Sequence, residues 1–206
     1  MAEVRAEPST SALVVVDVQN DFCHPDGVFA RAGFALTGLA ELIVNVNTLV
    51  RAARDGGRPV VWIRMEWSDD ESVGVLAERS RFLRREGLRA GTWGSELVDG
   101  LDVSAEDLVV TKQRFSAFYR TDLESRLRGR GVTTLVTAGV RTDFCVESTV
   151  RDAFFRDFRV VVAQDATASY VDDLHANSLR VMNTVFAQVT ELAPAAEILR
   201  GGGDPT

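Results

Sequence analysis

The sequence predicts a three-layer α/β/α fold, with helices on both faces of a six-stranded, mostly parallel, doubly wound sheet. Short apolar runs alternate with stretches of helical periodicity along the chain, which is typical of a parallel sheet built from strand–helix–strand units. Several of these runs lead into a charged residue or a cysteine, and open α/β folds bind ligands where the carboxyl ends of the strands meet. If the strand order is 3-2-1-4-5-6, a crevice opens between the first and fourth strands.

The first half of the chain supplies two strands and one long helix. Residues 13–16 are apolar and mostly β-branched, which predicts a strand buried on both faces, and Asp17 follows directly. Apolar residues at helical spacing over 39–53 predict the first long helix, and residues 59–65 predict the second strand. Residues 74–89 are charged and only weakly amphipathic, so we expect a helix or a lid there.

The second half supplies four more strands, with a helix between each strand and the next. The predicted strands are residues 108–111, 134–138, 160–163 and 188–191. The predicted helices are residues 123–130, 145–157 and 172–186. No repeat or linker interrupts this alternation, so we expect residues 1–206 to form one domain. The ends, residues 1–10 and 200–206, are expected to be flexible.

Charge and composition narrow the class of protein. Thirty acidic against 23 basic residues give a net charge of −7, which argues against nucleic acid or an anionic membrane as a partner. No apolar run approaches the roughly 20 residues of a membrane span, and the first residues do not resemble a secretion signal. Cys23 and Cys145 form no disulfide framework, which suits a reducing compartment. We therefore expect a cytoplasmic protein that acts on a small molecule.

Three strand ends carry groups that can do chemistry together. Asp17 supplies an acid or base, Lys112 supplies a fixed positive charge, and Cys145 supplies a nucleophile. Cys145 comes at the start of a predicted helix, where the helix dipole and unpaired backbone N–H groups favour thiolate over thiol. Each also has an ordinary alternative, because a lone cysteine is often a small buried hydrophobic residue. Asp17 and Lys112 can equally be a structural ion pair.

Four short motifs extend these strand ends. They are Asp17-Val18-Gln19-Asn20-Asp21-Phe22, Lys112-Gln113-Arg114-Phe115-Ser116-Ala117-Phe118, Gly139-Val140-Arg141-Thr142-Asp143-Phe144-Cys145-Val146 and Asp165-Ala166-Thr167. In their order and spacing, the motifs make the chain from about Ala12 to Glu191 resemble the isochorismatase-like cysteine hydrolases, a family that uses an Asp-Lys-Cys triad. The resemblance implies the same fold and a triad of Asp17, Lys112 and Cys145.

The resemblance also implies a mechanism. Cys145 would attack the carbonyl of a small amide, ureido or N-carbamoyl substrate to form a thioester acyl-enzyme, and Asp17 would carry the thiol proton to the departing amine. Lys112 would hold Asp17 in place. The backbone N–H groups of Arg141 and Cys145 would form the oxyanion hole, next to a cis peptide bond between Val140 and Arg141. The family usually has a small residue where this chain has Arg141.

Within the family, the segments around Lys112 and Cys145 most resemble the ureidoacrylate and N-carbamoyl amidohydrolase branch. Aromatic residues just past strand ends are expected to bind the substrate, with ordinary core packing as the alternative; they are Phe22, Trp67, Phe115, Phe118 and Tyr170. Substrates of this branch often carry a carboxylate. Arg31, Arg64 or Arg114 could bind it, and the sequence does not choose between them.

No metal or other cofactor is expected. Nicotinamidases of the superfamily carry a metal site after the second strand, whereas residues 64–72 of this chain contain no histidine, and His24 and His175 are far apart in the sequence. A metal-independent nicotinamidase-like amidase and an isochorismatase-type vinyl-ether hydrolase are the alternative activities, although the latter does not need Cys145. A non-enzymatic binding protein would tolerate the loss of a triad residue, and none is lost. We also expect a homo-oligomer, either a dimer or a tetramer.

Overall fold

The computed structural model describes residues 6–201, and the six strands within them form one sheet in the order β3-β2-β1-β4-β5-β6. The strands are β1 (Ser11–Val16), β2 (Val60–Met65), β3 (Leu108–Lys112), β4 (Thr134–Val140), β5 (Arg159–Ala168) and β6 (Gln188–Thr190). Every neighbouring pair is parallel. The predicted α/β fold and its 3-2-1-4-5-6 strand order are therefore confirmed.

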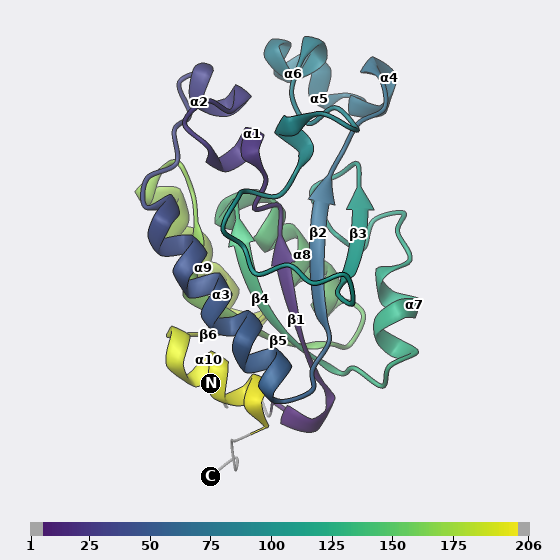
Figure 1. The fold of residues 1–206 in the computed structure, drawn as a ribbon, viewed down its shortest axis with the longest axis vertical. Helices are drawn as coiled ribbons and strands as arrows, with labels where there is room; N and C mark the ends of the chain where they lie inside the picture. The colour runs from purple at the N-terminus through teal and green to yellow at the C-terminus, as the bar shows by residue number, and fades with distance from the viewer. Residues whose placement is uncertain (1–5, 202–206) are drawn as a thin grey trace.

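Helices cover both faces of this sheet. The long helix α3 (Leu39–Asp55) and α10 (Leu192–Arg200) lie on the face nearer the viewer in Figure 1, and α8 (Glu147–Phe154) lies behind the strands. Helix α9 (Asp172–Val185) contacts α8, and α7 (Leu123–Arg128) follows β3. A further group lies beyond the carboxyl ends of the strands, in the upper part of Figure 1: α1 (Asn20–Cys23), α2 (Val28–Arg31), α4 (Asp70–Val73), α5 (Leu76–Arg79) and α6 (Arg81–Arg85).

Burial follows the position of each strand in the sheet. All residues of β1 and β4 are buried, because helices cover both sides of these central strands. The edge strands β3 and β6 are partly exposed. Helix α3 buries Leu42, Val46, Leu49 and Ala53 at helical spacing, so the apolar pattern of its sequence becomes the face that packs on the sheet.

Four local features differ from the sequence-based expectation. Strand β5 continues to Ala168, well past residue 163. The segment 74–89, expected to be a helix or a lid, contains two short helices, α5 and α6, in place of one continuous helix. The segment 142–146 is a single π-helical turn that precedes α8, so Cys145 lies inside that turn and not at the start of an α-helix. Helix α10 was not expected at all.

The ends of the chain are only partly described. Residues 1–5 and 202–206, which make up most of the segments expected to be flexible, lie outside the described residues. Within the described part, Pro8–Thr10 form a 3-10 turn, and the Glu7 backbone N–H donates to Thr134 Oγ1 at 3.1 Å. The start of the described chain is thus bound to the first residue of β4.

The switch point of the sheet lies between β1 and β4, where Val16 pairs with Gly139. Gly139 has φ +111°, and a Cβ atom there would lie 2.1 Å from the Val16 carbonyl oxygen. Only glycine allows this close approach of the two strands. Strand β1 ends at Val16, because the next residue, Asp17, adopts a left-handed conformation with φ 52°. Asp17 and the segment leading to Cys145 therefore leave the sheet side by side.

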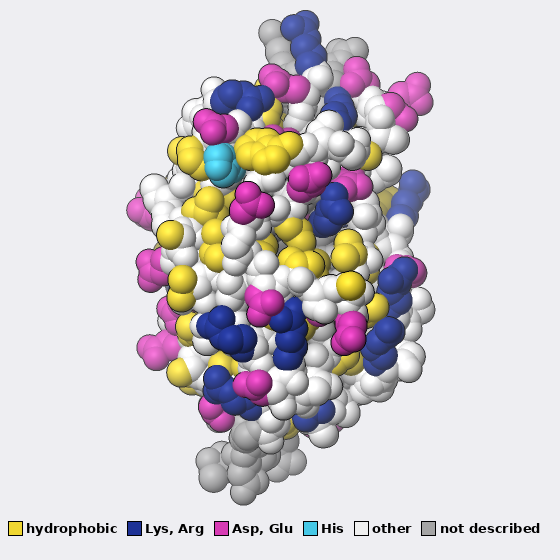
Figure 2. Space-filling view, viewed as in Figure 1, with side chains coloured by type: hydrophobic (Ala, Val, Ile, Leu, Met, Phe, Trp, Pro, Cys, Tyr) yellow, Lys and Arg dark blue, Asp and Glu magenta, His cyan; other side chains and the backbone are white. Residues whose placement is uncertain are grey.

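The surface carries charges of both signs. On the face shown in Figure 2, acidic and basic side chains are interspersed, and no large area of one sign is visible. Among residues 6–201, no helix is long and apolar enough to cross a membrane.

Candidate active site

Asp17 and Lys112 form an ion pair at the carboxyl edge of the sheet. Lys112 is the last residue of β3 and lies opposite Met65 of β2, so its long side chain reaches past β2 to the end of β1. Lys112 Nζ donates to Asp17 Oδ2 at 2.6 Å and to the Arg114 carbonyl oxygen at 3.1 Å. Both side chains of the pair are fully buried. A buried charge of this kind is tolerated only when it is paired.

The second carboxylate oxygen of Asp17 can accept a hydrogen bond from another donor. Oδ1 is buried and makes no hydrogen bond of ordinary length to any other group in residues 6–201. The neighbouring donor is the thiol of Cys145, which interacts with the Asp17 carboxylate and lowers its pKa. Burial has the larger effect and raises the pKa of Asp17, against the opposing charge of Lys112. The carboxylate is thus a base placed beside a thiol.

Burial has the largest effect on the titration of the Cys145 side chain. Burial raises the pKa of Cys145 well above the ordinary cysteine value; Lys112 opposes this shift, and the negative charge of Asp17 adds to it. Burial of the π-helical turn therefore acts against the expected preference for thiolate. A thiol with a raised pKa needs a base before it can act as a nucleophile, and the carboxylate next to this thiol is that of Asp17.

The peptide bond between Val140 and Arg141 is cis. It joins β4 to the π-helical turn that carries Cys145. The carbonyl oxygen of Arg141 accepts the backbone N–H groups of Phe144 at 3.2 Å and Val146 at 3.0 Å. These bonds fold the turn so that Cys145 lies between β4 and α8.

A cavity of about 190 Å³ opens in front of Cys145. This volume is below the roughly 300–1,000 Å³ of common ligand sites, so the cavity suits a small molecule. Its lining is mostly aromatic and aliphatic and consists of Phe22, Phe29, Phe34, Met65, Trp67, Leu76, Ser80, Phe82, Leu83, Phe115, Arg141, Phe144 and Cys145. Residues from α5 and α6 cover it on the side away from the sheet.

Three of the five aromatic residues expected in the pocket line this cavity: Phe22, Trp67 and Phe115. Tyr170 lies behind the wall, where its hydroxyl donates to the Phe22 carbonyl oxygen at 2.8 Å. Phe118 does not line the cavity, which corrects the expectation. Its ring packs on Phe158, with ring centroids 5.7 Å apart, in the core.

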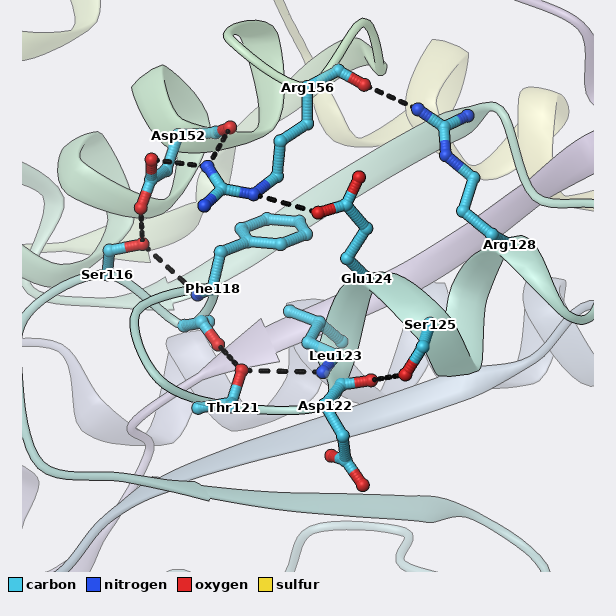
Figure 3. A network of polar contacts seen from close by, with 11 residues as sticks. Ser116, Phe118, Thr121, Asp122, Leu123, Glu124, Ser125, Arg128, Asp152 and Arg156 are labelled. Carbon is cyan, nitrogen blue, oxygen red and sulfur yellow. Dashed lines mark hydrogen bonds and ion pairs between the residues drawn. The ribbon is translucent and has the colours of Figure 1, made fainter.

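A polar network fixes the loop after β3 and explains where Phe118 goes (Figure 3). Ser116 Oγ donates to Asp152 Oδ2 of α8 at 2.5 Å and accepts the backbone N–H of Phe118 at 3.1 Å. Arg156 donates to the other oxygen of Asp152 at 2.5 Å and, in the same view, to a carboxylate of α7. The network therefore binds the loop that follows Lys112 to the helix that follows Cys145.

Two buried polar residues of the first motif hold the cavity together, and no role for them was expected. Gln19 bonds to the backbone N–H and C=O of Met65 at 2.8 and 2.9 Å, so it ties the segment after β1 to the end of β2. Asp21 accepts the backbone N–H groups of Val28 at 3.0 Å and Leu88 at 2.6 Å. The available signal was Asp21 itself, a second carboxylate in the segment that follows a buried strand, because buried carboxylates must be hydrogen-bonded.

None of the three arginines considered for a substrate carboxylate lines the cavity with Cys145. Arg31 pairs with Glu86 at 2.9 Å, and Arg64 pairs with Glu66. Arg114 donates to the carbonyl oxygen of Ser72 at 2.7 Å. The arginine in the cavity wall is Arg141.

No three His, Cys, Asp or Glu side chains within residues 6–201 are grouped so that they could hold a metal ion. His24 packs edge-on against the ring of Trp93, with centroids 5.0 Å apart. His175 Nδ1 lies 2.9 Å from Thr142 Oγ1. The two histidines are thus in separate places.

The sequence is similar to one protein family and to named relatives. The model of the isochorismatase domain matches residues 11–194. The ureidoacrylate amidohydrolase RutB of Methylobacterium radiotolerans is 38% identical over 205 residues, which cover 92% of this chain and 80% of that protein. Its counterpart from Klebsiella pneumoniae strain 342 is also 38% identical, over 78% of this chain and 74% of its own length.

Two solved structures extend the comparison. A cysteine hydrolase from Pseudomonas syringae pv. phaseolicola superposes with a TM-score of 0.86 at 27% identity, and 97% of each chain is covered. The N-carbamoylsarcosine amidase of Thermoplasma acidophilum superposes with a TM-score of 0.73 at 30% identity, over 89% of this chain and 97% of its own.

Proposed function

The chain belongs to the isochorismatase domain family, and from this we propose that it is a cysteine hydrolase that cleaves a C–N bond in a small amide, ureido or N-carbamoyl compound. The observation that carries the proposal is the buried pair of Lys112 and Asp17 beside the Cys145 thiol at the wall of the cavity. It is an amidohydrolase of non-peptide bonds, like the relatives whose names include ureidoacrylate and N-carbamoylsarcosine.

The proposed reaction takes place at the sulfur atom of Cys145. Asp17 takes the thiol proton while Sγ forms a bond to the substrate carbonyl carbon, and the carbonyl oxygen becomes an oxyanion. The backbone N–H groups of Arg141 and Cys145 are the proposed oxyanion donors. When the C–N bond breaks, Asp17 returns the proton to the leaving nitrogen and a thioester remains. Water then adds to the thioester, with Asp17 as its base, and releases the acid and the free thiol.

Lys112 has a positioning and electrostatic part in this scheme. Its ammonium group holds Oδ2 of Asp17, which leaves Oδ1 for the proton of the thiol. The positive charge also lies where negative charge builds up on sulfur, and it already lowers the pKa of Cys145 against the effect of burial.

The experiment is a screen of primary amides, N-carbamoyl acids and isochorismate, with release of ammonia or amine and loss of the vinyl ether as readouts. Cys145→Ala and Cys145→Ser should abolish turnover, and mass spectrometry of the wild type should detect the acyl-enzyme. Cys23→Ala is the matched control, since Cys23 is also buried with a raised pKa, and it should stay active. Turnover of isochorismate with every amide inert would replace the proposed activity by vinyl-ether hydrolysis.

Activity is expected to need no metal. Prolonged treatment with EDTA, followed by assay and metal analysis of the same sample, should leave the rate unchanged and detect no stoichiometric metal. Activity that returns only with added zinc or iron would contradict this expectation.

We further propose a cytoplasmic homo-oligomer, a dimer or a tetramer. Both cysteines are free and buried, which suits a reducing compartment. Phe154 and Phe155 are 39% and 68% exposed, and exposed aromatic groups of this kind support an interface between copies. Light scattering on the purified protein measures the oligomeric state.

A further inference from the structure

One cation lies in the wall of an otherwise nearly apolar cavity. Among the described side chains that line the cavity, Arg141 is the one with a permanent charge, and only Ser80 and Cys145 are polar besides it. The side chain of Arg141 is 14% exposed, so most of its hydration shell has been removed. A desolvated arginine in a cavity wall needs partners for its charge and for its N–H groups.

Asp143 provides a partner for one edge of the guanidinium. Arg141 Nε donates to Asp143 Oδ1 at 3.2 Å, and Nη2 donates to Oδ2 at 2.6 Å. Asp143 is itself held in place, because Ser169 Oγ donates to its Oδ1 at 2.5 Å. The two-point contact fixes the plane of the guanidinium as well as its position.

Two aromatic rings fix the same group from its faces. The guanidinium carbon of Arg141 lies 4.4 Å from the centroid of the Phe144 ring and 4.5 Å from that of Tyr170. Both distances are within the range of favourable cation–π contacts. Arg141 is therefore pre-organised, and a ligand that binds it does not have to order a flexible side chain.

The adjacent edge of the guanidinium, formed by Nη1 and Nη2, makes no hydrogen bond to the described residues. A guanidinium has five N–H groups, and the hydrogen bonds of Arg141 to the described residues use two of them. The two N–H groups of Nη1 and one of Nη2 remain, in the planar arrangement that fits both oxygens of a carboxylate.

We propose that the free edge of Arg141 binds a carboxylate on the substrate and so selects anionic ureido or amide compounds over neutral ones. The inference rests on the proposed function, since the same cavity presents Cys145 to the scissile carbonyl. The apolar walls would enclose the short chain between the two groups. Specificity then comes from Arg141 and reactivity from Cys145.

The test uses matched acids and esters: ureidoacetate, 3-ureidopropanoate and 4-ureidobutanoate, each beside its methyl ester. The wild type should hydrolyse its best acid with a kcat/KM at least about 10-fold above that of the ester. Arg141→Gln should lower kcat/KM for the acid by about 10- to 100-fold, mainly through KM, and change that for the ester by about 3-fold or less. Arg141→Lys, which keeps the charge without the planar fork, should fall between the two.

Arg151→Gln is the matched control. Arg151 also makes a two-point ion pair, to Glu147 at 2.9 and 2.7 Å, and lies 4.2 Å from a ring, that of Phe186, but it does not line the cavity. The Arg151→Gln variant should keep the preference for the acid over the ester. Equal use of acid and ester by the wild type, or equal losses on both in Arg141→Gln, would overturn the proposal without requiring any variant to be inactive.

Calorimetry separates this proposal from the proposed function. Cys145→Ala should bind the three acids more tightly than their esters, and Cys145→Ala/Arg141→Gln should lose the difference. If the wild type cleaves neither series while this binding pattern appears, the proposed function fails and the carboxylate site stands. If neither series is cleaved or bound, the carboxylate site fails as well.

Discussion

The cavity has a floor and a roof that are built in different ways. The floor consists of Cys145, which lines the cavity, and of the fully buried pair of Asp17 and Lys112 beside it; all three lie at or just beyond the carboxyl ends of strands of one sheet. The roof consists of α4, α5 and α6, residues 70–85, which lie beyond the sheet (Figure 1) and turn apolar side chains such as Leu76 and Phe82 toward the cavity. The floor is polar and enclosed, whereas the roof is apolar inside and charged outside.

The difference indicates that the floor and the roof contribute to different parts of the reaction. The floor takes its geometry from β1, β3 and β4, and moving any of its groups would disrupt the core. The roof helices have four or five residues each, far below the roughly 12–15 that make an isolated helix even marginally stable. They persist only through packing on the rest of the chain. We therefore expect changes in the floor to remove chemistry and changes in the roof to alter substrate binding.

The largest effect is expected from breaking the buried ion pair. Lys112→Met leaves the Asp17 charge buried and unpaired, which should cost about 3–5 kcal/mol of unfolding free energy. It should also lower kcat/KM by at least about 1,000-fold, because Asp17 is no longer held in place to act as the base. Denaturant unfolding and steady-state kinetics measure the two effects.

A double variant separates stability from chemistry. Asp17→Asn/Lys112→Met removes both charges and should regain much of the lost stability, while activity stays absent. If Lys112→Met were as stable as the wild type, the two side chains would not be the enclosed pair that the floor requires.

The second prediction concerns pH. Burial raises the pKa of Asp17, so this carboxylate protonates at a higher pH than an exposed aspartate. A protonated Asp17 cannot accept the thiol proton, and kcat/KM should fall about 10-fold per pH unit below the raised pKa. Because the folded state binds this proton more tightly than the unfolded state, the stability contribution of Asp17 is present at low pH and lost as pH rises through the raised pKa.

Activity and this stability contribution should therefore change in opposite directions between the ordinary aspartate pKa of about 3.9 and the raised value. The comparison is between the wild type and Asp17→Asn, in pH-dependent unfolding and in pH–rate profiles of the wild type. Identical pH slopes of stability in the two proteins would show that Asp17 titrates normally.

The floor was largely predictable from the sequence because its residues follow recognisable strands. Runs of β-branched residues locate the strands, and parallel strands bring their carboxyl ends to one edge, so Asp17, Lys112 and Cys145 were expected together. The direction in which the pKa of Cys145 is shifted was not predictable, because it depends on desolvation by residues distant in the sequence. A local argument about helix starts gave the wrong direction for its pKa.

The roof and the cavity walls were less predictable because loops are positioned by contacts far along the chain. Phe115 and Phe118 lie in the same motif, yet only Phe115 lines the cavity, since the contact between Ser116 and Asp152 turns the loop. The side chain of Arg141 likewise takes its place from Asp143 and two rings. Helix α10 was missed although its alanine and leucine content favours a helix; Pro194 lies in its first turn, where proline is tolerated.

The third prediction tests the roof as a binding element. Phe82 lines the cavity and packs edge-on against Phe29, with ring centroids 5.2 Å apart. Phe82→Ala should raise KM by about 5- to 10-fold and change kcat by about 2-fold or less, since apolar contact stabilises bound substrate and transition state equally. Steady-state kinetics on the best substrate measures both. A loss confined to kcat would place the roof in the chemical step instead.

The smallest effect is expected from the ion pair that joins the roof to α2. Arg31 Nη2 lies 2.9 Å from Glu86 Oε2, close to the 2.6 Å of the floor pair, but its two side chains are 53% and 57% exposed. Water and salt screen such a pair, so Arg31→Gln should cost about 1 kcal/mol or less of unfolding free energy and change KM by about 2-fold or less. Unfolding of both proteins at low and high salt measures the electrostatic contribution of this pair to the unfolding free energy. That contribution should vanish at high salt in the wild type. If Arg31→Gln lost as much unfolding free energy as Lys112→Met, the distance between the charges, and not their burial, would decide what an ion pair contributes. The contrast between floor and roof would then no longer hold.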